Sequence, residues 1–575
     1  MQTLNKKKAR FIVLSLIIPL TLLICFVVFP AGDLIRMSFT NWDGYSSSSD
    51  FIGFDNYISM FQNKDLWTSL RNNGVYFAAH LLFIPIELMV AVMLTSKMRA
   101  AKAYKTIVFL PYIINGVAIA YAFSYFFSPV NGAFNSMLEF AHLEGFIRNW
   151  LSDEKIVNFV LAFVSLWRFS GYHTVLFMAA LQSVPNEIME AAAMDGANSW
   201  HIFRYIQVPS IQLMVDFVLF DNIRGALQVF DIPFVMTAGG PGYASSTFTL
   251  HTIKTAFTFN NFGLASTMAV AIMVLIVVIY LIQNKILHIG RKAEKRKGKT
   301  KRIGIEILKQ AVGITMVFIV LAPILLTLFA SLKTKADMVN TSPLLLPELS
   351  RITFDNFKEV FANKYLLLGF KNTGIILVIS LIFNVMFGTM TAFILERFEF
   401  RMKKVIVALF FLGMLIPTFV TEIARFKIIT GLNLYNTLGA PIIIYVASDL
   451  MQLYIYRQFI STLPVSLDES ALLDGCSYFQ LFRKIIFPLL APATATVIII
   501  KSISIINDMY IPYLYMPKNK LRTLTTFLMD YANAQEGSWQ TLAAGIIVIM
   551  IPTVLIYIFF QKYILAGVAA GAVKG

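Results

Sequence analysis

One short segment occurs twice in this sequence, and the two copies keep the same internal spacing. The first copy consists of Glu190, Ala191, Ala192, Ala193, Met194, Asp195, Gly196, Phe203, Ile206 and Pro209. The second consists of Glu469, Ser470, Ala471, Leu472, Leu473, Asp474, Gly475, Phe482, Ile485 and Pro488, with each marker displaced by 279 residues. Pro185 and Pro464, which precede the copies, share that displacement. A repeat in one register indicates that the chain contains two versions of one structural unit.

The composition indicates the medium in which these units fold. Hydrophobic residues make up 57% of the chain and charged residues only 14%, with a mean hydropathy of +0.70. These values lie outside the range of soluble globular domains and indicate a membrane protein. The two cysteines, Cys25 and Cys476, offer no disulfide framework, so stability must come from helix packing.

Apolar stretches long enough to cross a bilayer occur six times in each half of the sequence. In the first half we expect spans near residues 11–29, 72–95, 106–128, 156–181, 211–235 and 264–283. In the second half we expect them near residues 311–330, 372–395, 405–424, 440–460, 490–512 and 541–560. The predicted fold is an all-α membrane protein of two homologous six-helix halves, with about 12 spans in total.

Basic residues predict which loops face the cytoplasm. Lysines and arginines precede the first span and follow the second, and ten of them lie between Lys285 and Lys309. The bias is weak in the second half, where the alignment of the repeats decides instead. We therefore expect both repeated loops, the segment between the halves and both termini to be cytoplasmic, in a multi-pass membrane protein.

The net charge of +16 also invites the hypothesis of nucleic-acid binding. The excess is concentrated in clusters beside the predicted spans, where topology and attraction to anionic lipid headgroups explain it. We expect no nucleic-acid partner. The stretch from Ala293 to Thr300 is one residue short of a phosphate-binding loop, because Ala stands where the first Gly belongs, and no strand precedes it.

A second repeat supports the division into halves. Phe54-Asp55-Asn56-Tyr57 recurs as Phe354-Asp355-Asn356-Phe357, displaced by 300 residues. We expect a first half over residues 1–287 with its repeated loop at 182–209, and a second half over 310–575 with its loop at 461–489. The basic segment 288–309 is then a cytoplasmic linker.

Each repeated loop is predicted to form a helix, a tight turn and a second short helix. Pro185 and Pro464 suit the first turn of a helix, and Gly196 and Gly475 suit the left-handed position that ends one. Asn198 or Ser199, and Ser477, can cap the second helix. We expect the acids of each copy, Glu190 and Asp195 or Glu469 and Asp474, to hold the turn through backbone N–H groups or an arginine.

At this point the residues resemble a known family. Glu-Ala-Ala, three residues, Gly and then Ile-x-x-Pro is similar to the signature loop of the permease subunits of binding-protein-dependent ABC importers, and the resemblance covers essentially the whole chain. It implies the type I permease fold, with each loop docking on a separate ATPase subunit. The residues that the resemblance assigns to coupling are Glu190, Ala191, Ala192, Asp195, Gly196, Glu469, Ser470, Ala471, Asp474 and Gly475.

Two further motifs resemble the carbohydrate branch, the maltose and multiple-sugar class. Thr237-Ala-Gly239-Gly240-Pro241 with Ser246-Thr247 looks like the first permease of such importers, and the glycine-rich C-terminus looks like the tail of the second. Ser470 and Cys476 depart from the usual residues of the loop. Two permeases on one chain are also a departure from the usual pair of separate subunits.

Polar side chains inside apolar spans are candidates for a sugar pathway, because they are costly there unless they face a cavity or a partner. Asp221, Arg224, Gln228 and Asp231 step by three, four and three residues, which on one helix confines them to an arc of about 80°. The other candidates are Asn115, Trp167, Arg168, Tyr172, Lys501, Ser504 and Asp508. The alternative is structural: Asp221 with Arg224 can be an ion pair, and Asn115 or Glu87 can bond across helices.

The resemblance implies import by alternating access. A sugar-loaded external binding protein would dock outside, and a cytoplasmic ATPase dimer, which binds ATP and Mg, would drive the change inside. The chain itself would be no enzyme, hold no cofactor or metal, and carry an oligosaccharide. The alternative is a secondary sugar transporter driven by an ion gradient, which would not need two ATPase-docking loops.

Overall fold

The computed structural model describes residues 2–46, 48–96, 98–289, 303–416, 418–447, 450–534 and 538–572. Its regular structure is helical, apart from an isolated bridge between Thr40 and Phe51 within these ranges. We call residues 2–289 the first half and residues 303–572 the second. The predicted linker 288–309 lies largely outside the described residues, which stop at Ile289 and resume at Ile303.

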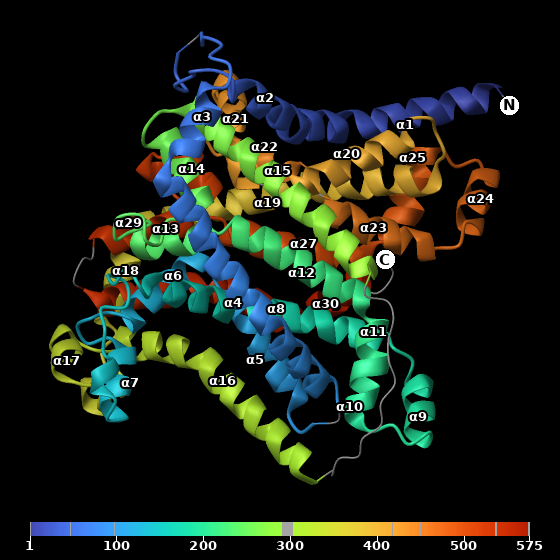
Figure 1. The fold of residues 1–575 in the computed structure, drawn as a ribbon. Coiled ribbons are helices and arrows are strands. Elements are labelled where there is room, and N and C mark those ends of the chain that lie inside the picture. The colour runs from blue at the N-terminus through green and yellow to red at the C-terminus, as the bar shows by residue number, and fades with distance from the viewer. Residues whose placement is uncertain are drawn as a thin grey trace.

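The helices follow one another in the same order in both halves (Figure 1). In the first half they are α1 (Gln2–Leu23), η1 (Ile24–Val28), α2 (Phe29–Met37), α3 (Asp55–Gln62), α4 (Lys64–Thr95), α5 (Ala101–Ile113), α6 (Gly116–Phe126), α7 (Ala133–Phe140), η2 (Glu144–Phe146), α8 (Val157–Gln182), α9 (Asn186–Met194), α10 (Ser199–Ile202), η3 (Phe203–Gln207), α11 (Val208–Ser210), α12 (Gln212–Leu227), α13 (Asp231–Thr237), α14 (Phe248–Phe257) and α15 (Phe262–Ile289).

In the second half they are α16 (Ile303–Ser331), α17 (Lys335–Asn340), η4 (Leu349–Arg351), α18 (Asp355–Ala362), α19 (Lys364–Arg397), α20 (Lys403–Leu415), α21 (Thr418–Gly431), α22 (Gly439–Val446), α23 (Leu450–Thr462), α24 (Ser466–Leu473), α25 (Tyr478–Leu481), η5 (Phe482–Ile486), α26 (Phe487–Leu489), α27 (Ala491–Asn507), α28 (Tyr510–Tyr515), η6 (Asn519–Leu521), α29 (Leu524–Ala534) and α30 (Trp539–Ala572).

Seven helices of the described residues are long and apolar enough to cross a membrane, and three bent pairs raise the possible number to ten. These ten coincide with ten of the predicted spans. The two remaining predictions, 405–424 and 440–460, are each divided between two helices, α20 with α21 and α22 with α23. One break falls at Ile416, whose extended backbone is what a following proline favours.

The predicted spans 106–128, 211–235 and 490–512 are not single helices, and the last of them is divided between α27 and α28. The first is bent by 96° between α5 and α6, where the Asn115 side-chain oxygen accepts hydrogen bonds from the backbone N–H groups of Val117 and Ala118. The second is interrupted between Leu227 and Asp231, so that α13 starts a new helix there. An asparagine that caps a new helix competes with continuation of the old one.

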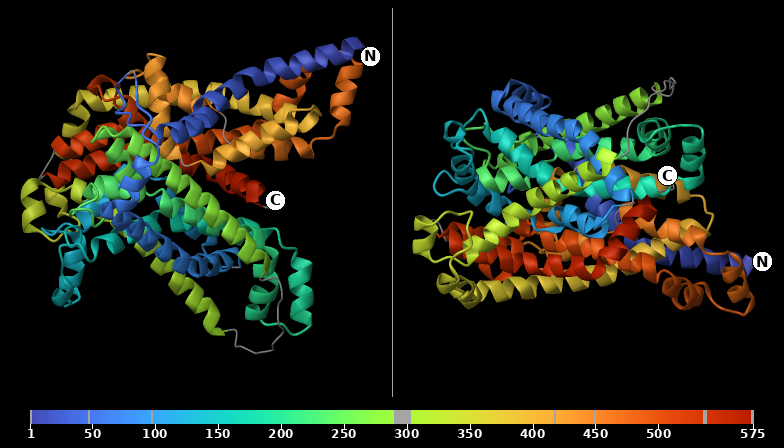
Figure 2. Two further views of the ribbon diagram at one scale, coloured as in Figure 1. Left: turned by 45° about the horizontal axis from the view of Figure 1, so that its top comes forward. Right: turned by 90° about the horizontal axis from the view of Figure 1, so that it is seen from below.

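The first helix of each half packs against the other half. The α1 helix lies along α19, and α16 lies along α5 and α6 (Figure 1). The contact is specific, because the Trp167 indole N–H on α8 donates to the backbone carbonyl of Ile319 on α16 at 2.9 Å. The two further views in Figure 2 show the halves side by side along their length.

Both ends of the helical bundle can be defined by the elements that gather there. The hairpins α9–α11 and α24–α26 lie at one end, which we call the hairpin end, and α7 and α17 lie at the other (Figure 1). The α1 and α16 helices begin, and the α15 and α30 helices end, on the hairpin side.

Candidate functional site

The two repeated loops form turns with equivalent hydrogen bonds. In the first, the N–H groups of Gly196 and Ala197 donate to the carbonyls of Ala193 and Ala192, at 3.1 and 2.9 Å. In the second, those of Gly475 and Cys476 donate to Leu472 and Ala471 at 3.1 and 3.0 Å. Each is a Schellman motif, which requires a left-handed residue, and both glycines have a φ of +83°. The prediction for both glycines is confirmed.

The second helix of each hairpin is capped as predicted. The Asn198 side chain accepts from the N–H of His201, and Ser477 forms a capping box with Gln480. The prolines differ slightly from expectation, since Pro185 is the residue before α9 and Pro464 precedes α24 by two positions. Pro185 has an extended backbone and is the N-cap of α9, whereas the Pro464 carbonyl accepts from the N–H of Leu467 at the start of α24.

The acids do not hold the turns, which corrects the sequence-based expectation. Within the described residues, none of Glu190, Asp195, Glu469 and Asp474 has a hydrogen-bond or ion-pair partner, and all four side chains are exposed. Backbone hydrogen bonds alone close both turns. Ala191, Gly196, Ser470 and Gly475 are exposed as well, whereas Ala192 is half-buried and Ala471 is buried.

Apolar side chains at equivalent positions of the two hairpins are also exposed. Met194 is 89% exposed and its counterpart Leu473 is 87% exposed. Trp200 and its counterpart Phe479 are exposed to 55% and 51%. Exposed apolar side chains that gather on one surface mark a contact site for a partner or a membrane.

Beyond each hairpin, the chain enters the bundle through a bend of the same size. The helix of α10 to α11 meets α12 at 72°, and that of α25 to α26 meets α27 at 73°. Each hairpin is therefore joined to a span by one continuous helical segment and a single bend.

The polar stripe predicted in the first half contains charged side chains that form ion pairs. Arg224 donates to Asp221 at 2.6 Å, and Arg168 on α8 forms an ion pair with Asp231. Because the helix is interrupted after Leu227, the single-helix arc assumed for Asp221, Arg224, Gln228 and Asp231 is wrong for its last member. Asp231 reaches the group from the start of α13 instead, and Gln228 is buried at the end of α12.

Other candidates in the first half have structural partners. The Trp167 indole N–H donates to the Ile319 carbonyl, and the ring packs against Phe123. Trp167 therefore belongs to the contact between the halves. Tyr172 stacks on Tyr112 with ring centroids 4.5 Å apart. Asn115 is fully buried and caps α6.

Several polar donors around this group have no partner within the described residues. They are Arg168 Nε, Arg224 Nε and Asn115 Nδ2, all of them buried atoms. A buried donor without an acceptor is costly, so such a group indicates either bound water or a ligand.

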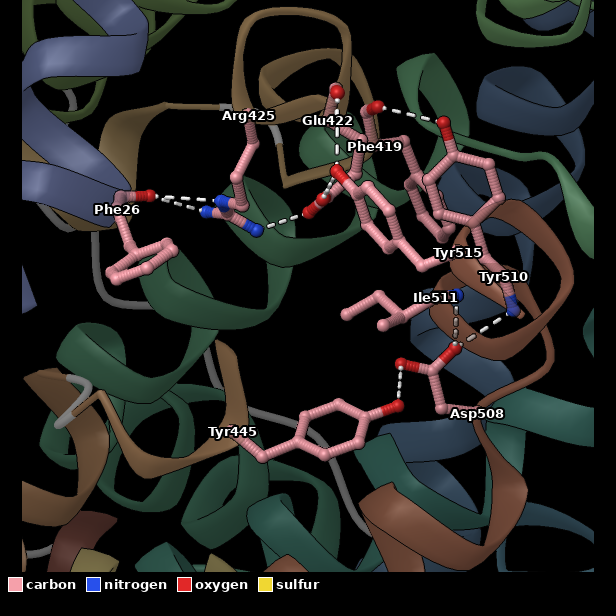
Figure 3. A network of polar contacts seen from close by, with 9 residues as sticks. All are labelled: Phe26, Phe419, Glu422, Arg425, Tyr445, Asp508, Tyr510, Ile511 and Tyr515. Carbon is pink, nitrogen blue, oxygen red and sulfur yellow. Dashed lines mark hydrogen bonds and ion pairs between the residues drawn. The ribbon is translucent and has the colours of Figure 1, made fainter. Parts of the chain in front are cut away.

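In the second half, Asp508 has three hydrogen bonds (Figure 3). It accepts from the Tyr445 hydroxyl at 2.9 Å and from the backbone N–H groups of Tyr510 and Ile511. It caps α28. Lys501 is half-buried and Ser504 is exposed, on the same helix, α27.

Two buried polar groups were missed, one of them in part, by the sequence analysis. Glu422 pairs with Arg425 on α21 and accepts from the Tyr515 hydroxyl at 2.8 Å (Figure 3). The arginine also donates twice to the backbone carbonyl of Phe26, at 3.0 and 2.6 Å. The signal was a Glu and an Arg three residues apart at the end of a predicted apolar span.

The second group, of which the sequence analysis named Glu87 and Asp221 but not His173, joins three helices of the first half. His173 Nδ1 lies 3.3 Å from Glu87, and its Nε2 lies 3.7 Å from Asp221. The cross-helix bond considered for Glu87 is therefore present. No group of His, Cys, Asp and Glu in the described part of the chain could hold a metal ion.

Comparison with known proteins defines the class. The family described as "Binding-protein-dependent transport system inner membrane component" matches residues 84–288 and 384–569. The probable ABC transporter permease protein YurN of Bacillus subtilis is 30% identical over 279 residues, which is 48% of this chain and 96% of that protein. The melibiose/raffinose/stachyose import permease protein MelC of the same species is 32% identical over 282 residues, 49% of this chain and 100% of that protein.

Among solved structures, a bacterial ABC transporter involved in the import of the acidic polysaccharide alginate overlaps with a TM-score of 0.45 and 20% identity. The overlap covers 51% of this chain and 100% of that chain.

The two matched stretches cover more than half of the chain, and it belongs to the binding-protein-dependent transport system inner membrane component family. It carries the family's domain once in each half, and each relative corresponds in length to about one half. The predicted all-α membrane fold with two homologous permease halves is confirmed.

Proposed function

We propose that this chain is the transmembrane permease of an ABC importer that moves a carbohydrate, an oligosaccharide, into the cell by alternating access. Residues 1–287 and 310–575 are its two permease halves, and 288–309 is the linker. The relatives support the sugar class, since they include a melibiose/raffinose/stachyose import permease.

The observation that carries the proposal is the duplicated surface of the hairpins. Met194 with Trp200, and Leu473 with Phe479, are exposed at equivalent positions beside unpaired carboxylates. A surface of this kind suits a protein partner with an apolar groove and a basic rim, and its presence twice suits a dimer. We assign it to a cytoplasmic ATPase dimer, which supplies ATP and Mg while this chain binds neither.

The opposite end of the bundle, where α7 and α17 lie, then faces outward and receives the sugar-loaded binding protein. Both termini and the linker are cytoplasmic in this orientation, in a bacterial cell membrane. The starts of α1 and α16 and the ends of α15 and α30 lie on the hairpin side, and the basic residues in the first turns of α1 and between Lys285 and Lys309 favour the cytoplasm.

The sugar path follows the polar group around α12 and α13. Its charges are paired, Arg224 with Asp221 and Arg168 with Asp231, which suits a neutral cargo. Arg224, whose side chain is partly exposed, can donate to sugar hydroxyl groups. On α27, Ser504 offers a hydroxyl group and Lys501 an amine from the other half.

Uptake by proteoliposomes tests the proposal. The permease alone should not accumulate a labelled oligosaccharide, and adding the ATPase, the binding protein and MgATP should start uptake. Gly196→Asp with Gly475→Asp places a Cβ and a charge in both left-handed turns. It should abolish uptake while leaving membrane insertion intact.

The matched control is Gly53→Asp, which also alters an open, positive-φ glycine but lies outside both repeated loops. It should transport normally. Equal uptake by the permease without an ATPase, driven by an ion gradient, would instead support the alternative of a secondary sugar transporter.

A further inference from the structure

The second hairpin is tied to a span by a buried ion pair that joins α24 to the end of α19. Arg397, the last residue of α19, lies with its Nε 2.9 Å from an Asp468 carboxylate oxygen. Both side chains are nearly buried, at 9% and 11% exposure. A buried charge is stable only beside an opposite charge. The ion pair therefore holds α24 and the end of α19 in one relative geometry.

Arg397 also contacts the chain on the other side of the prolyl residue that precedes the hairpin. Its terminal nitrogen Nη2 donates to the backbone carbonyl of Leu463 at 2.7 Å. The planar guanidinium of Arg397 therefore contacts the chain on both sides of Pro464. One contact is with Leu463, just before the hairpin, and the other is with Asp468, inside its first helix. Burial raises the pKa of the Asp468 carboxyl, and Arg397 opposes that shift by favouring the carboxylate.

The first hairpin has a different residue at the corresponding position. The displacement of 279 residues pairs Asp468 with Met189, which carries no charge. The Met189 sulfur instead accepts from Gln207, within the same hairpin, at 3.5 Å. Within the described residues, the Met189 contact stays inside the first hairpin, whereas the Arg397–Asp468 ion pair joins the second hairpin to a span.

The first helix of the chain adds a second brace to the same hairpin. Phe11 on α1 stacks on Tyr478 with ring centroids 5.8 Å apart and an interplanar angle of 22°. The counterpart of Tyr478 in the first hairpin is Ser199, which has no ring to stack. Both differences favour a stiffer mounting of the second hairpin.

We propose that Arg397 is a positioning residue that makes the second hairpin and α19 move as one unit, so that the two hairpins transmit motion unequally. This inference rests on the proposed role of the hairpins in coupling to an ATPase. The second hairpin passes a displacement directly to α19, while the first can rotate before its span follows.

The attachment of the second hairpin to α19 is tested on the purified permease without any ATPase. Spin labels at Ser470→Cys and Met402→Cys, in a chain with Cys25 and Cys476 replaced by Ser, report the distance between the hairpin and the turn that joins α19 to α20. Asp468→Asn keeps the shape and removes the charge, and it should broaden the distance distribution. The swap Arg397→Asp with Asp468→Arg should narrow it again.

The matched control is Glu399→Gln. It removes an ion pair with Lys403 that is just beyond α19 and does not involve the hairpin. It should leave the distribution unchanged. An unchanged distribution in Asp468→Asn would overturn the positioning role.

Coupling is then measured with the ATPase, the binding protein and MgATP in proteoliposomes. Asp468→Asn should lower the sugar moved per ATP hydrolysed by about 2- to 30-fold, the range over which residues along a coupling path act, while ATPase binding persists. Arg397→Lys, which keeps the positive charge, should lower the sugar moved per ATP hydrolysed by a smaller factor. A broadened spin-label distance distribution with an unchanged amount of sugar moved per ATP would refute the inference. Absence of ATP-driven uptake in the unmodified chain would refute the proposed function alone.

Discussion

Asparagines of the two halves make equivalent hydrogen bonds. The Asn56 carboxamide donates to the carbonyls of Ser38 and Thr40, at 3.0 and 2.8 Å. Asn356, displaced by 300 residues, donates to those of Ser331 and Lys333, at 2.9 and 2.8 Å. Each joins the short helix before the second span to the end of the first span. The recurrence of Phe-Asp-Asn in the sequence is thereby explained.

Asn356→Asp should destabilise the protein by about 1–3 kcal/mol, because it removes both N–H donors and leaves two buried carbonyls facing a carboxylate. Asn56→Asp should cost a similar amount. Thermal unfolding in detergent measures the effect, with Asn149→Asp as a control at an exposed position of a loop. A melting temperature of Asn356→Asp equal to that of the control would contradict this role.

At the scale of helices, a close backbone contact holds the broken third span of the first half. A Cβ built at Gly171 on α8 would overlap the backbone carbonyl of Val108 on α5. Only a glycine lets the two helices approach this far. The chain can then turn by 96° beyond α5 without losing its support from α8.

Gly171→Ala should lower stability by about 1–3 kcal/mol, as overpacking against a rigid neighbour does. Gly74→Ala is the matched control, since Gly74 lies inside α4 and an added Cβ there meets nothing within 4 Å. It should be neutral or stabilising by up to about 1 kcal/mol, because alanine favours a helix. Thermal unfolding of the two variants measures the difference. Equal changes in melting temperature would exclude close packing as the reason why position 171 is a glycine.

The sequence was sufficient for features that depend on local chemistry. Gly196, Gly475 and Ser477 were assigned correctly, and Asn198 was one of the two caps considered, because turn and cap preferences act within a few residues. The break after Leu227 was missed because an apolar run looks the same whether its helix continues or restarts. Tertiary contacts decide between the two.

At the scale of the whole molecule, the two halves exchange their first helices. Contacts that cross between halves include the Arg425 bonds to the Phe26 carbonyl and the Trp167 bond to Ile319. Trp167 was assigned to the sugar path because its partner, on α16, lies far along the chain. Asn507 likewise donates to the carbonyl of Ile113 at 2.7 Å, from α27 to the break in the third span of the first half.

This exchange predicts that the covalent link is dispensable once the protein has folded. A protease site inserted between residues 295 and 296 and cut in detergent should leave an affinity-tagged first half and the second half together on a column. The halves stay joined because α1 is held by α19, and α16 by α5 and α6. Release of the second half after the cut would show that the contacts between the halves are too weak to hold them, and Arg425→Ala should promote release by removing the bonds to Phe26.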